Sequence, residues 1–250
     1  MRDRISPAPD WYLLRLSLML MLSVRAWQLG RGELSGWDGV SALPATGLVL
    51  VWAAGALACL GMPDRRRAVI WIICGAGTTA WVITRWIAAH GLLYELIENS
   101  LQAFLPWIVA AMAWTPAQAA ASRYRRGLTW AVVMTFLGHG LYALGAGVPV
   151  PQHFLTMVMS VLHLSQAQAR IFLAAAGCMD LLVCMLVWWP RTARYALGYA
   201  ACWGILTAIA RVWAYAEPGD ITTWVRWLPE TLVRLPHGLI PLALLRTRQI

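Results

Sequence analysis

The feature that most constrains this chain is a series of apolar runs, each near membrane-spanning length, with the charged residues confined between them. A helix needs about 20 predominantly apolar residues to cross the hydrocarbon core of a bilayer. Eight such runs are present, at residues 11–29, 43–62, 68–89, 96–114, 128–146, 169–189, 195–215 and 224–245. Membrane barrels would instead show short strands of alternating polarity. The sequence therefore predicts an all-α, polytopic transmembrane helical bundle of about eight spans.

The composition supports a membrane protein. Only 12% of the 250 residues are charged, whereas a soluble chain of this size carries about a quarter. The net charge of +9 comes from short basic clusters between the apolar runs, and no basic face with interleaved stacking aromatics indicates nucleic-acid binding. Because the first run is followed by Gly30-Arg31 rather than a small-residue cleavage site, we expect it to remain as a first transmembrane helix.

The loop charges predict the orientation. The basic residues fall in alternate loops or at the termini, namely Arg2, Arg4, Arg65, Arg66, Arg67, Arg123, Arg125, Arg126, Arg191, Arg194, Arg246 and Arg248. The opposite loops are neutral or mostly acidic, with Glu33, Glu95, Glu217 and Asp220. Since cytoplasmic loops carry the excess of Arg and Lys, both termini should be cytoplasmic, in a multi-pass protein of the cell inner (cytoplasmic) membrane.

A weak internal repeat predicts two tandem four-helix units, residues 1–122 and 123–250. Arg67 precedes Arg85 by nearly the same distance as Arg194 precedes Arg211, and each later Arg ends an apolar run. With four spans per unit, the two copies would face the same way. Residues 147–168 interrupt the pattern, with an apolar stretch that is too short to cross and should form a helix at the outer interface. We expect Ser165 to cap the span that follows.

Two acid–base pairs are the first candidates for chemistry. Arg85 with Glu98, and Arg211 with Glu230, place an Arg late in one span and a Glu early in the next. Because a lone charge in lipid is costly, each Arg should meet its Glu within the bundle. The pairs would either staple a helical hairpin or form polar, gating sites that open outward.

His139 and Asp180 are the candidate ligand-binding residues of the second unit. His139 lies between two glycines in the fifth run, and Asp180 lies near the middle of the sixth. An ionisable residue at this depth is a functional candidate, and the partner of Asp180 should be His139 or Arg211. In the first unit, Arg25 lies near the position equivalent to His139, and the position equivalent to Asp180 has only small apolar residues. This difference favours a site in the second unit.

Haem and metal sites are not expected. His139 has no evident histidine partner at the same depth, because the other histidines should lie at or outside the interface, namely His90, His153, His163 and His237. The five cysteines lie within apolar runs without metal-ligand spacing, so no metal site is predicted. A quinone remains possible as a ligand, since His139 could bond a quinone carbonyl.

The second unit resembles the DoxX-like family of integral membrane proteins. The resemblance covers residues 124–189 and lies in the run from Phe136 to Gly140, in Ser165-Gln166-Ala167-Gln168-Ala169, and in the stretch around Asp180. It implies a four-helix membrane unit in which His139 and Asp180 match the family's polar residues. Some members are small subunits associated with thiosulfate:quinone oxidoreduction or with membrane redox-stress complexes. The first unit departs from the pattern at both positions.

Three functions remain open from the sequence. The first is a DoxX-like membrane subunit, quinone-linked or accessory to a redox assembly. The second is a small-solute or proton-coupled transporter or channel, with Arg85, Glu98, Arg211 and Glu230 around a polar site between the two units. The third is a structural subunit that binds lipid and other membrane-protein subunits without chemistry of its own.

Overall fold

The computed structural model describes residues 10–33, 42–61, 64–115 and 117–247, and every regular element in these ranges is an α-helix. The helices in chain order are α1 (Trp11–Gly30), α2 (Ala42–Ala58), α3 (Arg65–Ala88), α4 (Leu93–Glu98), α5 (Ser100–Trp114), α6 (Ala117–Leu144), α7 (Gln152–Leu162), α8 (Gln166–Leu186), α9 (Ala193–Tyr215), α10 (Ile221–Leu232) and α11 (Pro236–Arg246).

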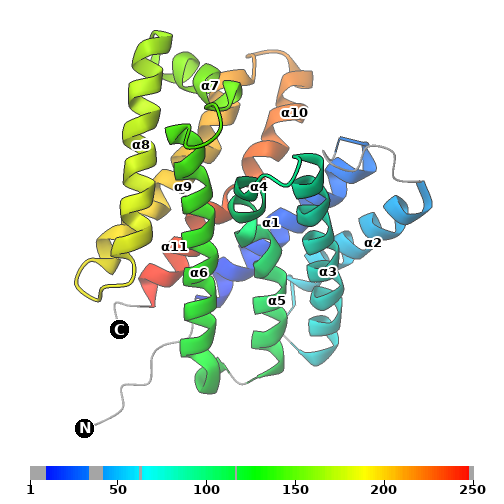
Figure 1. Cartoon of the computed structure of the whole chain (residues 1–250). Coiled ribbons are helices and arrows are strands. Elements are labelled where there is room, and N and C mark those ends of the chain that lie inside the picture. Colours follow the sequence, from blue (N-terminus) through cyan, green and yellow to red (C-terminus); the bar gives the residue numbers. More distant parts are fainter. Residues whose placement is uncertain (1–9, 34–41, 62–63, 116, 248–250) are drawn as a thin grey trace.

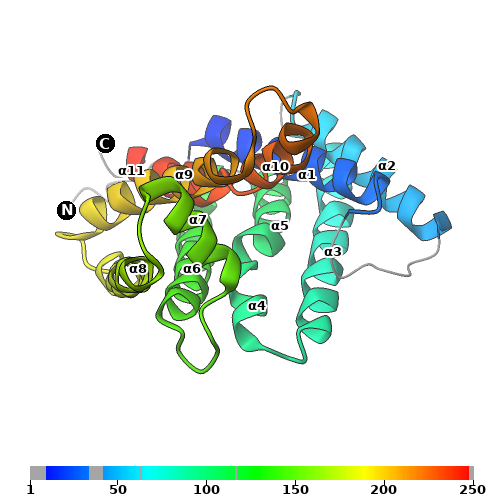
Figure 2. The same cartoon turned by 90° about the horizontal axis from the view of Figure 1, so that it is seen from above.

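The main helices form a closed ring in chain order (Figures 1 and 2). Contacts join α1 to α2, α2 to α3, α3 to α5, α5 to α6, α6 to α8, α8 to α9 and α9 to α11, and α11 returns to α1. The view from above shows this ring flattened into two layers (Figure 2). Contacts of α1 with α5 and of α6 with α11 cross its middle. The first and last helices are therefore neighbours.

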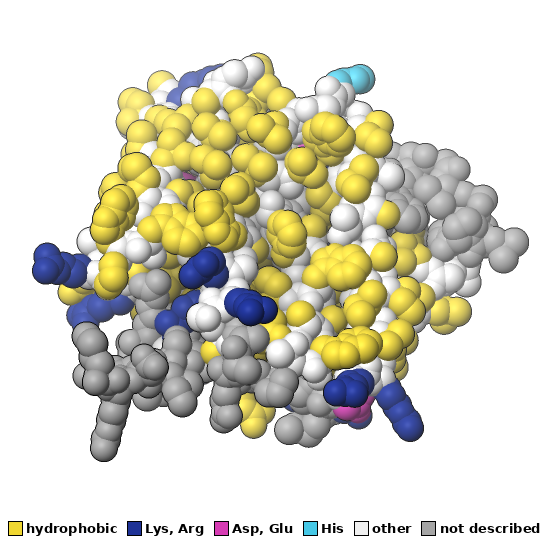
Figure 3. Space-filling model, turned by 60° about the horizontal axis from the view of Figure 1, so that its bottom comes forward, with side chains coloured by type: hydrophobic (Ala, Val, Ile, Leu, Met, Phe, Trp, Pro, Cys, Tyr) yellow, Lys and Arg dark blue, Asp and Glu magenta, His cyan; other side chains and the backbone are white. Residues whose placement is uncertain are grey.

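Five helices in the described part of the chain are long and apolar enough to cross a membrane. They span Arg65–Ala88, Leu93–Trp114, Ala121–Leu144, Gln166–Leu186 and Ala193–Tyr215. Large apolar side chains such as Ile171, Leu206 and Ile87 are exposed on their outer faces. Figure 3 shows a mostly hydrophobic surface, with Arg side chains gathered in its lower part. Exposed apolar surface of this extent is typical of contact with lipid or with another protein.

The fourth and eighth predicted spans are each broken into two helices. Asn99 separates α4 from α5, and residues 233–235 separate α10 from α11. Pro236 is the first residue of α11, and Pro229 lies inside α10. Proline lacks an N–H, so Pro236 cannot donate the helical hydrogen bond to the carbonyl of Leu232, which accepts from Leu235 instead. The second break brings the start of α11 into the interior.

The predicted short helix and the predicted cap are confirmed. α7 has 11 residues, and Ser165 and Gln168 form a reciprocal capping box at the start of α8. Aspartates cap three other helices, namely Asp10 on α1, Asp64 on α3 and Asp220 on α10. The Thr222 hydroxyl and backbone N–H donate to Asp220 and lower its pKa, and the backbone N–H of Arg67 does the same for Asp64. The predicted basic residues Arg2, Arg4 and Arg248 lie outside the described residues.

Candidate functional site

A cavity of about 430 Å³ lies in the second half of the chain, between α6, α7, α8, α9 and the start of α11. We call it the inner cavity. Its lining is mostly apolar, with Phe136, Phe154, Leu173 and Trp203 among the larger side chains. Its polar lining residues are Asp180, Thr207, His139, His237, Arg211 and Arg234. An apolar chamber with a few polar groups is the usual form of a small-molecule site.

The inner cavity has apolar wall residues that are also exposed on the outside of the molecule. Leu162 of α7 and Leu206, Ile209 and Trp213 of α9 line the cavity, and all four are exposed. The opening between α7 and α9 is therefore bordered by apolar side chains. A ligand dissolved in lipid would meet no polar barrier there.

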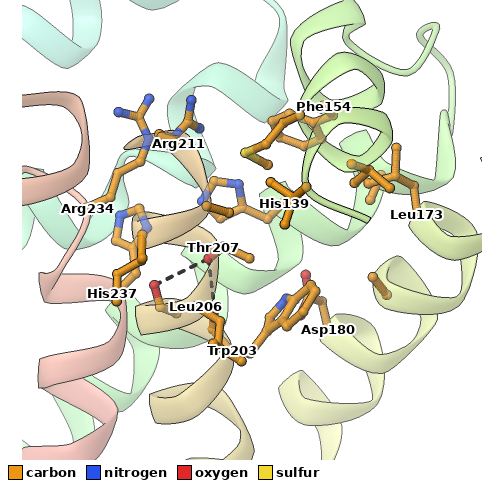
Figure 4. A pocket seen from close by; sticks show the side chains of 18 of the residues that line it. His139, Phe154, Leu173, Asp180, Trp203, Leu206, Thr207, Arg211, Arg234 and His237 are labelled. Carbon is orange, nitrogen blue, oxygen red and sulfur yellow. Dashed lines mark hydrogen bonds between the residues drawn. The ribbon is translucent and has the colours of Figure 1, made fainter. Parts of the chain in front are cut away.

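A second cavity of about 210 Å³, which we call the outer cavity, adjoins the first. Its walls are more polar and include Arg85, Glu95, Glu98, Gln102 and Tyr142. Residues that line both cavities form the boundary between them, namely His139, Phe154, Arg211, Arg234 and His237. Figure 4 shows the two histidines and two arginines of this boundary together on one side of the inner cavity.

His139 and His237 lie side by side on this boundary, with ring centroids 5.3 Å apart. This corrects the prediction that His139 has no histidine partner at its own depth, since the buried His237 ring lies beside it. The break before Pro236 explains the difference, because it turns the first residues of α11 toward α6 and α9. The Nε2 atom of His237 has no hydrogen-bond partner among the described residues.

Glycines set the position of His139. A Cβ atom at Gly138 would lie 2.7 Å from the backbone nitrogen of Glu98, and one at Gly140 would lie 3.1 Å from the carbonyl oxygen of Gly177. A side chain at Gly138 would meet the backbone of α4, and one at Gly140 would be placed tightly against α8. The two neighbours of His139 thus let α6 approach α4 on one side and α8 on the other.

Arg211 is the least satisfied charged residue of the boundary. Its side chain is 8% exposed, and it makes no hydrogen bond or ion pair with any described residue. The predicted Arg211–Glu230 pair is therefore not formed. Glu230 instead forms an ion pair with Arg234, one helical turn later, and accepts a hydrogen bond from Gln28 at 2.6 Å. Pairing with a residue one turn later in the chain, just after α10, thus prevails over the pairing between helices.

Arg85 also has a nearer partner than predicted. Its guanidinium forms an ion pair with Glu95 at 2.8 Å, and the Tyr142 hydroxyl donates to the same carboxylate at 3.2 Å. Glu98 lies one turn further along, where its Oε2 is 3.7 Å from Nδ1 of His139. That distance is beyond hydrogen-bond length. Glu98 thus faces the boundary histidine across the outer cavity.

Asp180 lines the inner cavity with His139 and Arg211, its two predicted partners, but its Oδ1 bonds to neither. The side chain is 4% exposed, and Oδ1 has no hydrogen-bond partner among the described residues. Figure 4 places Asp180 beside Trp203, across the cavity from Arg211. The cavity therefore has polar groups on two opposite sides.

Arg25, the first-half counterpart of His139, lies in a buried polar cluster. It donates to Gln28 at 2.8 Å and to Gln102 at 2.6 Å, and its guanidinium lies 3.8 Å from the centre of the Trp81 ring. Gln28 links this cluster to Glu230. Arg25 was noted from the sequence, but Gln28 and Gln102 were not, although an amide within an apolar run is itself a signal of interior hydrogen bonding.

Arg234 and His237 are the boundary residues that sequence reasoning missed or misplaced. The signal was the Arg234-Leu235-Pro236-His237 run, in which two polar residues flank a helix break inside an apolar span.

Metal binding has no support in the described ranges, where no group of three or more His, Cys, Asp or Glu could hold an ion. The five cysteines are free, and two of them, Cys178 and Cys202, are exposed.

No family model matches the chain, and comparisons with curated proteins and with solved structures also give no match.

Proposed function

We propose that this protein is a quinone-binding subunit of DoxX-like type in the cell inner membrane, accessory to a redox assembly. Arg211 carries the proposal. A buried guanidinium without a partner costs several kcal/mol in low-dielectric surroundings, so a bound ligand that supplies an oxygen acceptor would stabilise it. Arg211 faces a cavity with apolar walls and an opening bordered by apolar side chains. A ring oxygen with an apolar ring and tail fits these requirements.

The architecture supports the duplicated, eight-span arrangement within this proposal. Each neighbour relation in the first half has an equivalent in the second: α1–α2 corresponds to α6–α8, α2–α3 to α8–α9, and α3–α5 to α9–α11. The contacts between the halves are equivalent as well, since α5–α6 corresponds to α11–α1 and α4–α6 to α10–α1. Both termini would then be cytoplasmic, and the outer cavity would lie toward the opposite face.

The test is whether the protein binds quinone and whether that binding depends on Arg211. Protein purified in a mild detergent should release quinone on solvent extraction. Arg211→Leu should weaken the binding of a short-chain quinone roughly 10- to 100-fold, since a hydrogen bond to a charged group contributes about 1.5–3 kcal/mol. Arg194→Leu makes the same replacement at an exposed site and should bind as the wild type does. Equal affinity of the two variants would refute the proposal.

Transport is the second candidate, and the shared boundary of the two cavities favours it. Five residues separate the polar outer cavity from the inner cavity, so a movement of the Arg211 and His139 side chains would join them. On the other side of the inner cavity, buried residues such as Leu128, Val183 and Leu197 would close the path. This function predicts a solute flux in liposomes that Glu230→Gln abolishes.

A scaffold would show neither a flux nor a ligand. It would co-purify with larger subunits, which native mass spectrometry of gently solubilised membranes would detect together with any bound quinone.

A further inference from the structure

Asp180 is the polar group of the inner cavity that the proposed function leaves unused. Asp180 lies on α8, and a Cβ atom added at Gly140 of α6 would lie 3.2 Å from the Cβ atom of Asp180. Asp180 therefore packs close against α6. The side chain is 4% exposed, and Oδ1 bonds to no described residue.

The surroundings of Asp180 contain no described cation that would pair with it. No ion pair of Asp180 occurs among the described residues, and its titratable neighbours are the uncharged side chains Cys184 and Tyr199. A buried carboxyl in such a place is unfavourable unless hydrogen-bond partners reach it. The Trp203 side chain interacts with the Asp180 carboxyl, but Oδ1 has no partner among the described residues, and a partner for Oδ1 would come from the inner cavity.

The distance across the cavity suits a small aromatic ring. Asp180 lies beside Trp203 (Figure 4), and Trp203 precedes Arg211 by eight residues on α9, which corresponds to about 12 Å of helix. The two para oxygens of a quinone ring lie about 5 Å apart, and a hydrogen bond at each end adds about 2.8 Å. The ring would thus span about 11 Å between Arg211 and the Asp180 carboxyl.

The residue types favour the reduced ring. A carboxyl group accepts a hydrogen bond from a hydroxyl in either protonation state, whereas only its protonated form can donate to a quinone carbonyl. A guanidinium donates to the oxygen of a carbonyl or of a hydroxyl. A hydroquinone therefore satisfies both ends under all conditions.

We propose that the inner cavity binds a hydroquinone across its width, with one ring oxygen at Arg211 and the opposite hydroxyl donating to Asp180. The ring lies between Phe154 and Trp203, and its tail leaves through the opening between α7 and α9. This inference rests on the proposed function, because it assigns the oxidation state and the orientation of the same ligand.

The test compares two ligands that differ by one hydroxyl: a decyl hydroquinone and the decylphenol that lacks one of its hydroxyls. Equilibrium binding is measured by calorimetry in detergent at fixed pH, under reducing conditions. The wild type should bind the hydroquinone about 10-fold more tightly than the phenol. Asp180→Leu should bind the two equally and should retain the wild-type affinity for the phenol, which shows that the cavity is intact. Asp180→Asn keeps an acceptor and should preserve part of the preference.

Equal binding of the two ligands by the wild type would overturn the assignment of Asp180, as would a preference that persists in Asp180→Leu. If neither ligand binds the wild type, the proposed function itself fails.

Discussion

The two halves of the molecule treat a buried arginine in opposite ways. In the first half, Arg25 has two amide acceptors, Gln28 and Gln102, and lies over the ring of Trp81. In the second half, Arg211 has no described hydrogen-bond partner and faces a cavity. Burial is nearly the same, at 6% and 8% exposed. What differs is the supply of acceptors, and on this difference we assign Arg25 to the fold and propose a ligand for Arg211.

The largest effect should come from removing an acceptor of Arg25. Gln102→Leu leaves the buried guanidinium with one fewer hydrogen bond, and a bond to a charged group contributes about 1.5–3 kcal/mol. We expect the free energy of unfolding to fall by about 3 kcal/mol, measured by denaturation in mixed micelles. Gln166→Leu, at an exposed position, is the matched control. If both variants unfold alike, the Arg25 cluster contributes nothing to stability.

Helix packing gives the second comparison between the halves. A Cβ atom at Gly204 would lie 2.6 Å from the backbone of His237, whereas one at Gly75 would lie 2.7 Å from the exposed ring of Trp107. A side chain can turn aside more easily than a backbone. Gly204→Ala should therefore lower the free energy of unfolding by about 2 kcal/mol. In Gly75→Ala, the gain of about 1 kcal/mol in helix propensity should offset most of the cost.

The same two variants separate packing from ligand binding. Gly204→Ala displaces His237 and should weaken quinone binding, while Gly75→Ala should leave it unchanged. Binding that is lost equally in both would contradict a site confined to the second half.

Much of this architecture was predictable, because apolar runs between charges show directly in the sequence. The helices that coincide with the predicted runs, the short α7 and the Ser165 cap depend on local patterns of hydrophobicity and capping. The partners of the charges were not predictable, because they depend on side-chain direction after a helix break. Arg234 lies one turn from Glu230 and so competes with Arg211, yet only the break before Pro236 brings Arg234 and His237 to the cavity.

The inner cavity itself could not be predicted, since a void is a property of packing among α6, α7, α8 and α9. The sequence did indicate its two most informative residues, His139 and Asp180, because ionisable groups in apolar runs are rare. The amides Gln28 and Gln102 within apolar runs indicate interior hydrogen bonding, but not that Arg25 would be their partner or that Arg211 would have no acceptor among the described residues.

A smaller effect is expected at the ion pair between Arg85 and Glu95, which lines the outer cavity. Both side chains retain some exposure, at 25% and 16%, so the pair is less desolvated than the Arg25 cluster. Partly exposed ion pairs contribute up to about 1 kcal/mol. Glu95→Gln should therefore lower the free energy of unfolding by about 1 kcal/mol or less, and salt should reduce the difference. A loss of unfolding free energy as large as that of Gln102→Leu would show that this pair contributes as much to stability as the Arg25 cluster.

The smallest effect on stability should come from Arg211, although it is as deeply buried as Arg25. Arg211→Leu removes no hydrogen bond to the described chain and relieves the cost of burying a cation. We expect the ligand-free protein to be no less stable than the wild type, with a gain of up to about 1 kcal/mol. Added quinone should raise the free energy of unfolding of the wild type, because a ligand that binds only the folded state stabilises it. Quinone should not change the stability of Arg211→Leu. An arginine that is costly without ligand and stabilising with it belongs to a binding site. A loss of several kcal/mol in ligand-free Arg211→Leu would instead make it a structural residue like Arg25.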